Sequence, residues 1–310
     1  MRAPEFWSRR SAVSRLLAPL GWCYAAAGWW RWRRARPARV GVPVVCVGNL
    51  VVGGAGKTPT VRALAQMLQD RAPHVLTRGY GGRLAGPVRV DPARHAAADV
   101  GDEPLLLARD LPVWVARDRA AGGLAAAAGG AGVILMDDGF QNPSLAKDVS
   151  LLVVDAEQGF GNGQCLPAGP LREPPGRGLT RADAIVLIGE GAPALAFEGP
   201  VFRARIVPTG DASAWRGRRV VAFAGIGRPD KVFATLRDLG AEVCATRAFA
   251  DHHRYTAAEL ARLADLASAG AALVTTEKDH VRLPAGWGDR VETLPVALRF
   301  ADPDAVASWL

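Results

Sequence analysis

The stretch VGNLVVGGAGKTP, residues 47–59, decides the fold. It follows an apolar run at residues 42–47 and leads into an amphipathic segment at residues 59–71, which predicts a strand, a glycine-rich loop and a helix. In such a loop the glycines let backbone N–H groups turn toward phosphate oxygens, and the helix N-terminus adds the positive end of its dipole. We therefore predict a P-loop that binds the triphosphate of ATP.

The residue types at the end of this loop suit a phosphate site. Lys57 would bridge the β- and γ-phosphates, the Thr58 hydroxyl would bind Mg²⁺, and Pro59 fits a first helical turn that needs no N–H partner. Val51 is a departure, because the usual GxxxxGKS/T pattern has glycine there, and it predicts a differently shaped entry to the loop. The predicted nucleotide-binding residues are Gly53, Gly54, Ala55, Gly56, Lys57, Thr58 and Pro59.

A second motif supports the nucleotide site. The string GVILMDDGFQ, residues 132–141, reads as a buried strand that ends in two carboxylates. In an open α/β sheet ligands bind at the carboxyl ends of the strands, where an acid can hold Mg²⁺ directly or through water. Asp137 and Asp138 are therefore predicted metal residues, with a simple Asp-Gly turn as the alternative.

The rest of the chain alternates between apolar runs and amphipathic segments, which is typical of a parallel βαβ sheet. Residues 166–179 are rich in Pro and Gly, so we expect a long functional loop there. Expected strands cover residues 42–47, 74–77, 113–116, 133–136, 149–154 and 184–188, and expected helices cover residues 59–71, 103–109 and 119–128.

The pattern starts again after about residue 200. We expect an α/β fold made of a P-loop NTPase-type lobe with a parallel sheet over residues 41–200 and a smaller α/β lobe over residues 201–310, joined by a linker strand at residues 201–207. In the smaller lobe we expect strands at residues 220–224, 242–246, 272–276 and 291–296, a turn at 225–229, and helices at 231–239 and 257–269.

The excess positive charge lies in the first forty residues. Residues 1–40 contain nine arginines and one acid, Glu5, which accounts for the whole formal net charge of +8. A nucleic-acid binder would carry basic residues over its folded surface, so no nucleic-acid partner is expected. The four cysteines form no CxxC pair, which argues against a zinc site or disulfide framework and fits a reducing cytoplasm.

Residues 1–40 also contain five of the nine tryptophans. The uncharged stretch at residues 16–30 would reach only about 22 Å as a helix, which is short of a hydrocarbon core of about 30 Å. Tryptophans and flanking arginines suit a helix that lies in the membrane interface. Two alternatives are a cleaved signal peptide, which the arginines at residues 31–39 disfavour, and a helix packed on the protein's own core.

Two further clusters contain groups that can exchange a proton. Asp102, in GDEP at residues 101–104, stands at a predicted helix start, where it would either cap the helix or point into a cleft. The string Asp251-His252-His253 is the chain's one histidine pair, and a histidine near carboxylates is a common proton acceptor at neutral pH.

Together these motifs closely resemble the tetraacyldisaccharide 4′-kinases of lipid A synthesis, and the match runs in order over nearly the whole chain. The strings that carry the resemblance are VGNL and GGAGKTP within residues 47–59, RGYG at 78–81, GDEP at 101–104, DDGFQ at 137–141, LPAGPLREP at 166–174, AGIGRP at 224–229, DHH at 251–253 and TTEKD at 275–279.

The resemblance implies transfer of the γ-phosphate of ATP to the 4′-hydroxyl of a tetraacylated glucosamine disaccharide 1-phosphate. It also implies two α/β lobes, with an enzyme bound peripherally to the cytoplasmic face of the bacterial inner membrane. Each buried CH₂ contributes about 0.8 kcal/mol, so a four-chain lipid leaves the bilayer only at great cost and the enzyme should come to it. The implied partner is this membrane-embedded lipid A precursor, and no obligate protein partner is evident.

The resemblance also assigns roles to residues. Asp102 would take the proton from the 4′-hydroxyl, and His252 would pair with it from the opposite lobe. Glu103, Asp137 and Asp138 would organise Mg²⁺ together with Thr58. The expected phosphate or substrate contacts are Arg78, Arg117, Arg119, Gln141, Glu173 and Lys278, with only one of Arg117 and Arg119 facing the site and a strand-end salt bridge as the alternative for Lys278.

Two other functions are considered. A GTPase switch needs an N/T-K-x-D element, but in TEKD at residues 276–279 the aspartate directly follows the lysine. A non-catalytic ATP-binding membrane adaptor would keep its function without the Asp102 carboxylate.

Overall fold

The computed structural model describes residues 4–267 and 270–310, which form two compact units. The larger unit contains residues 4–206 and 298–310, and the smaller unit contains the described part of residues 207–297. The sequence division after residue 200 differs from this boundary and left residues 298–310 in the smaller lobe. These residues belong to the larger unit because side chains such as Leu298 and Val306 pack into its core.

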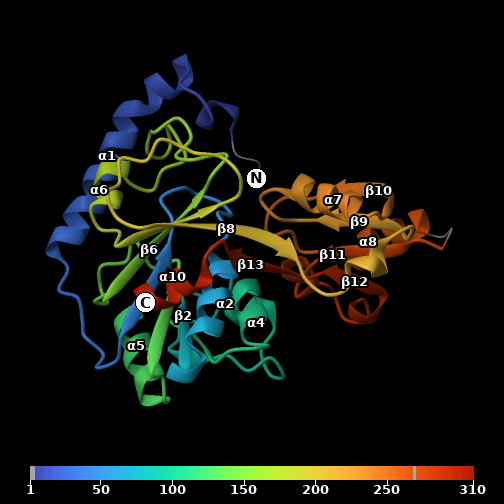
Figure 1. The fold of residues 1–310 in the computed structure, drawn as a ribbon, viewed down its shortest axis with the longest axis horizontal. Coiled ribbons are helices and arrows are strands. Elements are labelled where there is room, and N and C mark those ends of the chain that lie inside the picture. The colour runs from blue at the N-terminus through green and yellow to red at the C-terminus, as the bar shows by residue number, and fades with distance from the viewer. Residues whose placement is uncertain (1–3, 268–269) are drawn as a thin grey trace. The chain divides into compact units, whose positions relative to one another are not determined.

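In the described part of the larger unit, a nine-stranded sheet has the order β13-β8-β7-β6-β1-β5-β2-β4-β3 (Figure 1). Strand β1 pairs in parallel with β5 and β6, whereas the short β3 pairs antiparallel with β4. The strands are β1 (Val44–Gly48), β2 (Pro73–Thr77), β3 (Val88–Arg89), β4 (Val113–Val115), β5 (Val133–Asp137), β6 (Val149–Asp155), β7 (Ala184–Ile188), β8 (Val201–Pro208) and β13 (Val296–Phe300).

Both faces of this sheet are covered, because successive side chains of its central strands enter two different apolar clusters. On β1, Val45 and Val47 pack on one face and Val44 and Cys46 on the other. The first face is covered by α2 (Lys57–Met67), α4 (Asp102–Leu107) and α10 (Pro303–Trp309), and the second by α5 (Arg119–Ala128) and α6 (Pro175–Leu179). The predicted lobe with a parallel sheet is therefore confirmed, and the structure shows that helices cover both faces of the sheet.

The expected loop at residues 166–179 is irregular up to Pro174 but ends in the short helix α6. The remaining short elements of this unit are η1 (Glu5–Trp7), η2 (Gln69–Arg71) and α3 (Ala97–Val100).

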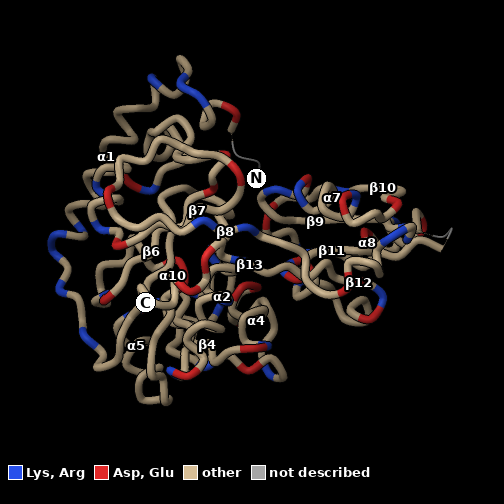
Figure 2. The backbone as a smooth tube through the Cα atoms, in the orientation of Figure 1, with Lys and Arg blue, Asp and Glu red and all other residues tan. Residues whose placement is uncertain are grey.

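The N-terminal helix α1 spans Ala12–Arg34 and is longer than the uncharged stretch. Ser11 caps it, because its hydroxyl accepts a hydrogen bond from the Ser14 N–H at 3.2 Å. Among the helices of the described chain, none is both long and apolar enough to cross a membrane. The basic residues of α1 and of the segment that follows it are all arginines (Figure 2).

The side of α1 that contacts the rest of the larger unit is narrow. Its buried residues, in a helix that is described throughout, are Ser14 and Gly21. A Cβ atom at Gly21 would lie 2.9 Å from the carbonyl oxygen of Cys165, so glycine allows the close approach. Just before the helix, the Trp7 indole donates to the Pro167 carbonyl at 3.1 Å. The helix therefore lies on the predicted Pro- and Gly-rich loop.

The described residues of the smaller unit contain a four-stranded parallel sheet with the order β10-β9-β11-β12. Its elements are η3 (Ala212–Trp215), β9 (Arg219–Ala224), α7 (Pro229–Asp238), β10 (Glu242–Ala248), α8 (Ala257–Leu266), β11 (Ala272–Thr276), α9 (Glu277–His280), η4 (Gly288–Arg290) and β12 (Val291–Leu294). Helix α7 packs on one face and α8 on the other.

Two elements expected in the smaller lobe have other bounds in the structure. The strand expected near residues 291–296 is found as β12 over Val291–Leu294. It ends earlier than expected because Pro295 separates it from β13, which joins the other sheet. The helix expected at residues 257–269 is found as α8 up to Leu266, and residues 268–269 lie outside the described residues.

We predict that Gly48→Ala, at the end of β1, destabilises the larger unit by about 1–3 kcal/mol through overpacking. A Cβ atom there would lie 2.4 Å from the Phe140 Cβ, which is fully buried. Urea denaturation followed by circular dichroism measures the change. Gly28→Ala in α1 is the control, since it meets nothing within 4 Å and should be neutral or stabilising. Equal midpoints for wild type and Gly48→Ala would contradict the prediction.

Candidate active site

The predicted strand–loop–helix is present, with β1 ending at Gly48 and α2 beginning at Lys57. Gly56 is the N-cap of α2 and has a φ of +88°, and a Cβ atom there would lie 2.6 Å from the Ile188 Cδ1. The positive φ therefore favours glycine, and a side chain here would also displace the end of Ile188. A pocket lined by residues 49–55, 153–155 and 158–160 opens along the loop.

Asn49 stabilises the entry to the loop, a role that the sequence analysis missed. Its side chain is buried, its amide donates to the Val51 carbonyl at 2.7 Å, and its oxygen accepts from the Lys57 ammonium at 3.1 Å. Val51 itself forms an isolated antiparallel β-bridge with Leu171. The buried Asn49 and the segment at Leu171 thus shape the entry to the loop, where the usual pattern has glycine. The position of Asn49 in the string VGNL was the one feature of the sequence that could have indicated this role.

The two carboxylates after β5 have different environments. Asp137 is buried at the strand end, and burial, with the Glu103 and Asp138 charges, raises its pKa to about 7. Burial would also raise the pKa of Asp138, but the Lys57 and Arg172 charges bring it below its ordinary value. Asp138 Oδ1 lies 2.6 Å from Arg172 Nη1 and 3.7 Å from Lys57 Nζ. Within the described residues, Asp138 is therefore ion-paired and Asp137 is not.

The residues present fit a Mg²⁺ ion that arrives with a nucleotide. Asp137 Oδ1 is buried and has no hydrogen-bond partner within the described residues. The charge of Glu103 acts on Asp137, and Thr58 lies in the first turn of α2. In the chain as described there is no group of three or more His, Cys, Asp or Glu arranged to hold a metal alone. Mg²⁺ commonly uses one or two carboxylates and takes its other ligands from phosphates and water.

A polar network ties residues 172–181 to the P-loop. The Gln141 amide donates to the Asn49 carbonyl at 2.9 Å and to Glu173 Oε1 at 3.0 Å. Glu173 also pairs with Arg181. Gln141 and Glu173, which were expected to contact phosphate or substrate, are thus engaged in supporting the loop. Arg172, which binds Asp138, was not among the predicted site residues although it lies in the string LPAGPLREP.

The two candidate arginines after β4 have different surroundings. Arg119 begins α5 and is buried, and burial lowers its pKa to about 10 against the opposing Asp137 charge. Arg117 is exposed, and its guanidinium lies 3.4 Å from the Arg83 carbonyl oxygen. The exposed Arg78 is near enough for its charge to act on Arg119. Of these two candidates, Arg119 is therefore the one that lies near the carboxylates, because it is buried and the Asp137 and Asp138 charges act on it.

Asp102 is the first residue of α4, and Gly101 occupies the N-cap position. Of the two alternatives for Asp102, helix capping therefore does not apply. Its side chain is buried, and Asp102 Oδ1 accepts a hydrogen bond from the Glu103 N–H at 3.1 Å. Gly101 allows close contact with the RGYG loop, since a Cβ atom there would lie 2.5 Å from the Tyr80 carbonyl oxygen.

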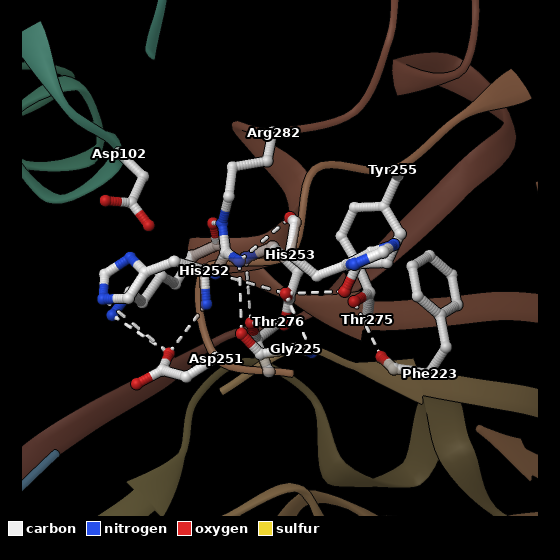
Figure 3. A network of polar contacts seen from close by, with 12 residues as sticks. Asp102, Phe223, Gly225, Asp251, His252, His253, Tyr255, Thr275, Thr276 and Arg282 are labelled. Carbon is white, nitrogen blue, oxygen red and sulfur yellow. Dashed lines mark hydrogen bonds and ion pairs between the residues drawn. The ribbon is translucent and has the colours of Figure 1, made fainter. Parts of the chain in front are cut away.

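His252 and Lys278 belong to the smaller unit. His252 Nε2 lies 3.8 Å from Asp251 Oδ1 (Figure 3). Lys278 Nζ lies at the same distance from this oxygen. The neighbouring His253 Nε2 lies 3.2 Å from the Glu259 carboxylate. The salt bridge that was the alternative for Lys278 is therefore present, and Asp251 links Lys278 to His252.

The chain is similar to proteins of known activity over almost its full length. A family model described as tetraacyldisaccharide-1-P 4′-kinase matches residues 13–310. The tetraacyldisaccharide 4′-kinase of Rhodospirillum centenum is 56% identical over 99% of this chain and 95% of its own length. That of Dinoroseobacter shibae is 54% identical over 100% of this chain and 97% of its own length. Among solved structures, LpxK from Aquifex aeolicus in complex with ATP matches with a TM-score of 0.79 and 28% identity, over 96% of this chain and 98% of that one.

The raised pKa of Asp137 predicts that the nucleotide-free protein loses stability as the pH rises. The pKa of the Asp137 carboxyl is 3.8 in the unfolded chain and about 7 in the folded one. Between these two pH values the folded state holds the proton and the unfolded state does not. The free energy of unfolding should then fall by at most about 4 kcal/mol over this range, at about 1.4 kcal/mol per unit. Asp137→Asn should flatten the decline.

Urea denaturation between pH 4 and 8, in buffer without divalent cations, measures this effect. Asp70→Asn, at an exposed acid of the same unit, is the control and should keep the wild-type slope. Parallel curves for wild type and Asp137→Asn would show that Asp137 is not the group responsible.

Proposed function

The chain belongs to the tetraacyldisaccharide-1-phosphate 4′-kinase family, and we propose that it transfers the γ-phosphate of ATP to the 4′-hydroxyl of a tetraacylated glucosamine disaccharide 1-phosphate. The observation that carries this proposal is the set of charged groups at the carboxyl ends of β1 and β5. Lys57 lies 3.7 Å from Asp138, while the charges of Glu103 and Arg119 act on Asp137. Phosphoryl transfer depends mainly on positioning and on stabilising such charge.

In this proposal the P-loop N–H groups and Lys57 bind the β- and γ-phosphates. Thr58 and Asp137 would hold Mg²⁺, with Glu103 and Asp138 close by. The bound Mg²⁺ would neutralise charge on the phosphate oxygens. Arg119 is buried next to the same carboxylates and would balance charge that develops on the transferring group.

We propose that the Asp102 carboxylate accepts the proton of the 4′-hydroxyl. A carboxylate with an ordinary pKa of about 3.9 is a weak base, so a partner that shares the proton helps the transfer. His252 of the smaller unit is the proposed partner. Arg78, Arg117 and Lys278 remain candidate substrate or phosphate contacts, and Lys278 already has Asp251 as an ion-pair partner.

The exposed side of α1 supports contact with the cytoplasmic face of the inner membrane. Apolar residues recur along it at helical spacing and are exposed, and they are Leu16, Leu20, Cys23, Ala27 and Trp30. Leu16 is 81% exposed, and the exposure of such a row of apolar side chains to water is unfavourable. Near the end of the helix Arg34 stacks on Trp30, with its guanidinium 4.0 Å from the ring centroid. Such a helix suits the interface, where arginines meet anionic headgroups.

The proposal is tested by incubating the protein with ATP, Mg²⁺ and a tetraacylated disaccharide 1-phosphate in mixed micelles. Mass spectrometry should find one added phosphoryl group, located on the distal sugar by fragmentation. Replacing ATP with GTP separates a kinase from a GTPase switch. Product formation in neither case, with ATP still bound, would favour the membrane adaptor instead.

We predict that Asp102→Asn lowers kcat by at least about 100-fold while the Kd for ATP changes less than about twofold, because the base is lost and the P-loop is untouched. Lipid phosphorylation and isothermal titration calorimetry measure the two quantities. Asp110→Asn, at an acid just after the same helix, should retain wild-type turnover. Normal turnover of Asp102→Asn would remove Asp102 as the base.

We also predict that Leu16→Glu combined with Leu20→Glu weakens binding to vesicles of anionic phospholipid at least about tenfold. The new carboxylates would face lipid and repel the anionic surface. Vesicle sedimentation measures binding, and turnover on a water-soluble substrate analogue should be unaffected. Leu124→Glu, at a leucine on α5 that is 55% exposed, is the matched control. Equal binding of the double variant and the control would exclude α1 as the contact.

A further inference from the structure

Two sequence motifs of the smaller unit meet at one buried carboxylate, that of Asp279. Asp279, from TTEKD, is fully buried. Its Oδ1 accepts from the Gly225 N–H at 3.0 Å and from the Tyr255 hydroxyl at 2.7 Å, and its Oδ2 accepts from the Thr276 hydroxyl at 2.6 Å. The strings AGIGRP and TTEKD are therefore joined at Asp279, together with Tyr255, although they lie far apart in sequence.

Arg282 connects this network to the histidine loop. Its guanidinium lies 3.2 Å from Asp279 Oδ1, and its side chain is only 5% exposed. Arg282 Nη1 donates to the carbonyl oxygens of Gly225 at 3.1 Å and His253 at 3.2 Å. One buried arginine thus joins the turn after β9 to the loop that contains His252.

His252 has a backbone conformation that needs such support. Its φ is +60°, in the left-handed region that residues with side chains rarely occupy. Its N–H donates to the Gly225 carbonyl at 3.1 Å and to Asp251 Oδ1 at 3.0 Å. Gly225 also allows close packing, since a Cβ atom there would lie 2.9 Å from the Tyr255 hydroxyl oxygen and 3.0 Å from the Ala250 carbonyl oxygen.

We propose that Arg282 and Asp279 are positioning residues, which hold His252 in its left-handed conformation through Gly225 and the His253 carbonyl. This inference rests on the proposed proton-sharing role of His252. A buried ion pair is often no more stabilising than apolar residues of similar size, and its best-attested benefit is to select one arrangement of the chain. Here the arrangement selected is that of a loop bearing a proposed proton-sharing group.

The test is a kinetic double-mutant cycle on the full chain with Arg282→Met and His252→Ala. Arg282→Met should lower kcat about tenfold or more, because misplacing a reacting group by about 1 Å can cost 10²-fold. The KM for ATP should stay within about twofold. In the His252→Ala background, Arg282→Met should have no further effect on kcat. Equal effects of Arg282→Met in both backgrounds would overturn the inference.

Arg218→Met is the matched control. Arg218 forms an ion pair with Glu292 on β12 in the same unit, and among the described residues it has no hydrogen bond or ion pair with Asp279, Arg282 or His252. It should leave kcat unchanged. If Arg282→Met does not fold, Tyr255→Phe replaces it, because that variant keeps the ion pair and removes one hydrogen bond to Asp279. Its smaller loss of kcat, about two- to fivefold, should likewise vanish when His252 is alanine.

A failure of the proposed function gives a different result. If His252→Ala keeps full activity, the proton-sharing role is wrong, whatever Arg282 does. The effect of Arg282 on the position of His252 is then measured by NMR from the imidazole resonances of His252. They should shift in Arg282→Met while those of His95, in the larger unit, stay in place. Unchanged His252 resonances would refute the positioning role.

Discussion

The parallel pairing of β1 with β5 is the constraint on which the rest of the site depends. The register places Val47 opposite Asp137, so the P-loop and the acidic strand end leave the sheet side by side. Both strands are buried on both faces, which fixes this register because a slip by one residue would exchange the two apolar clusters. The phosphate loop and the predicted metal carboxylates are therefore brought together by ordinary sheet packing.

That arrangement concentrates charge where water is scarce. Asp137 is raised in pKa by burial, whereas Asp138 is kept ionised by Lys57 and Arg172. Arg119 is buried beside them and has a lowered pKa for the same reason. Such a set costs stability in the nucleotide-free protein, yet it is suited to a ligand that brings its own negative charge and cation.

Much of this could be predicted from the sequence, because the P-loop and the strand before Asp137 are local patterns. The features that were missed depend on contacts between distant segments. Asn49 and Arg172 act through side-chain contacts that spacing does not reveal, and burial alone distinguishes Arg119 from Arg117. The division of residues 291–300 between two sheets follows from Pro295 and from pairing partners outside the local sequence.

In helix α1 the pattern of apolar residues does not mark the side that packs on the protein. Its apolar residues would normally face a core, yet Leu16 and Leu20 are exposed and the contact side uses Ser14 and Gly21. Small residues allow the helix to approach the loop at Cys165 closely, and the large residues are left on the other side. The net charge of +8 lies in the same segment, so apolar surface and positive charge are presented together. At an anionic bilayer each arginine near the surface contributes about 1 kcal/mol, which the neutral remainder of the chain would not supply.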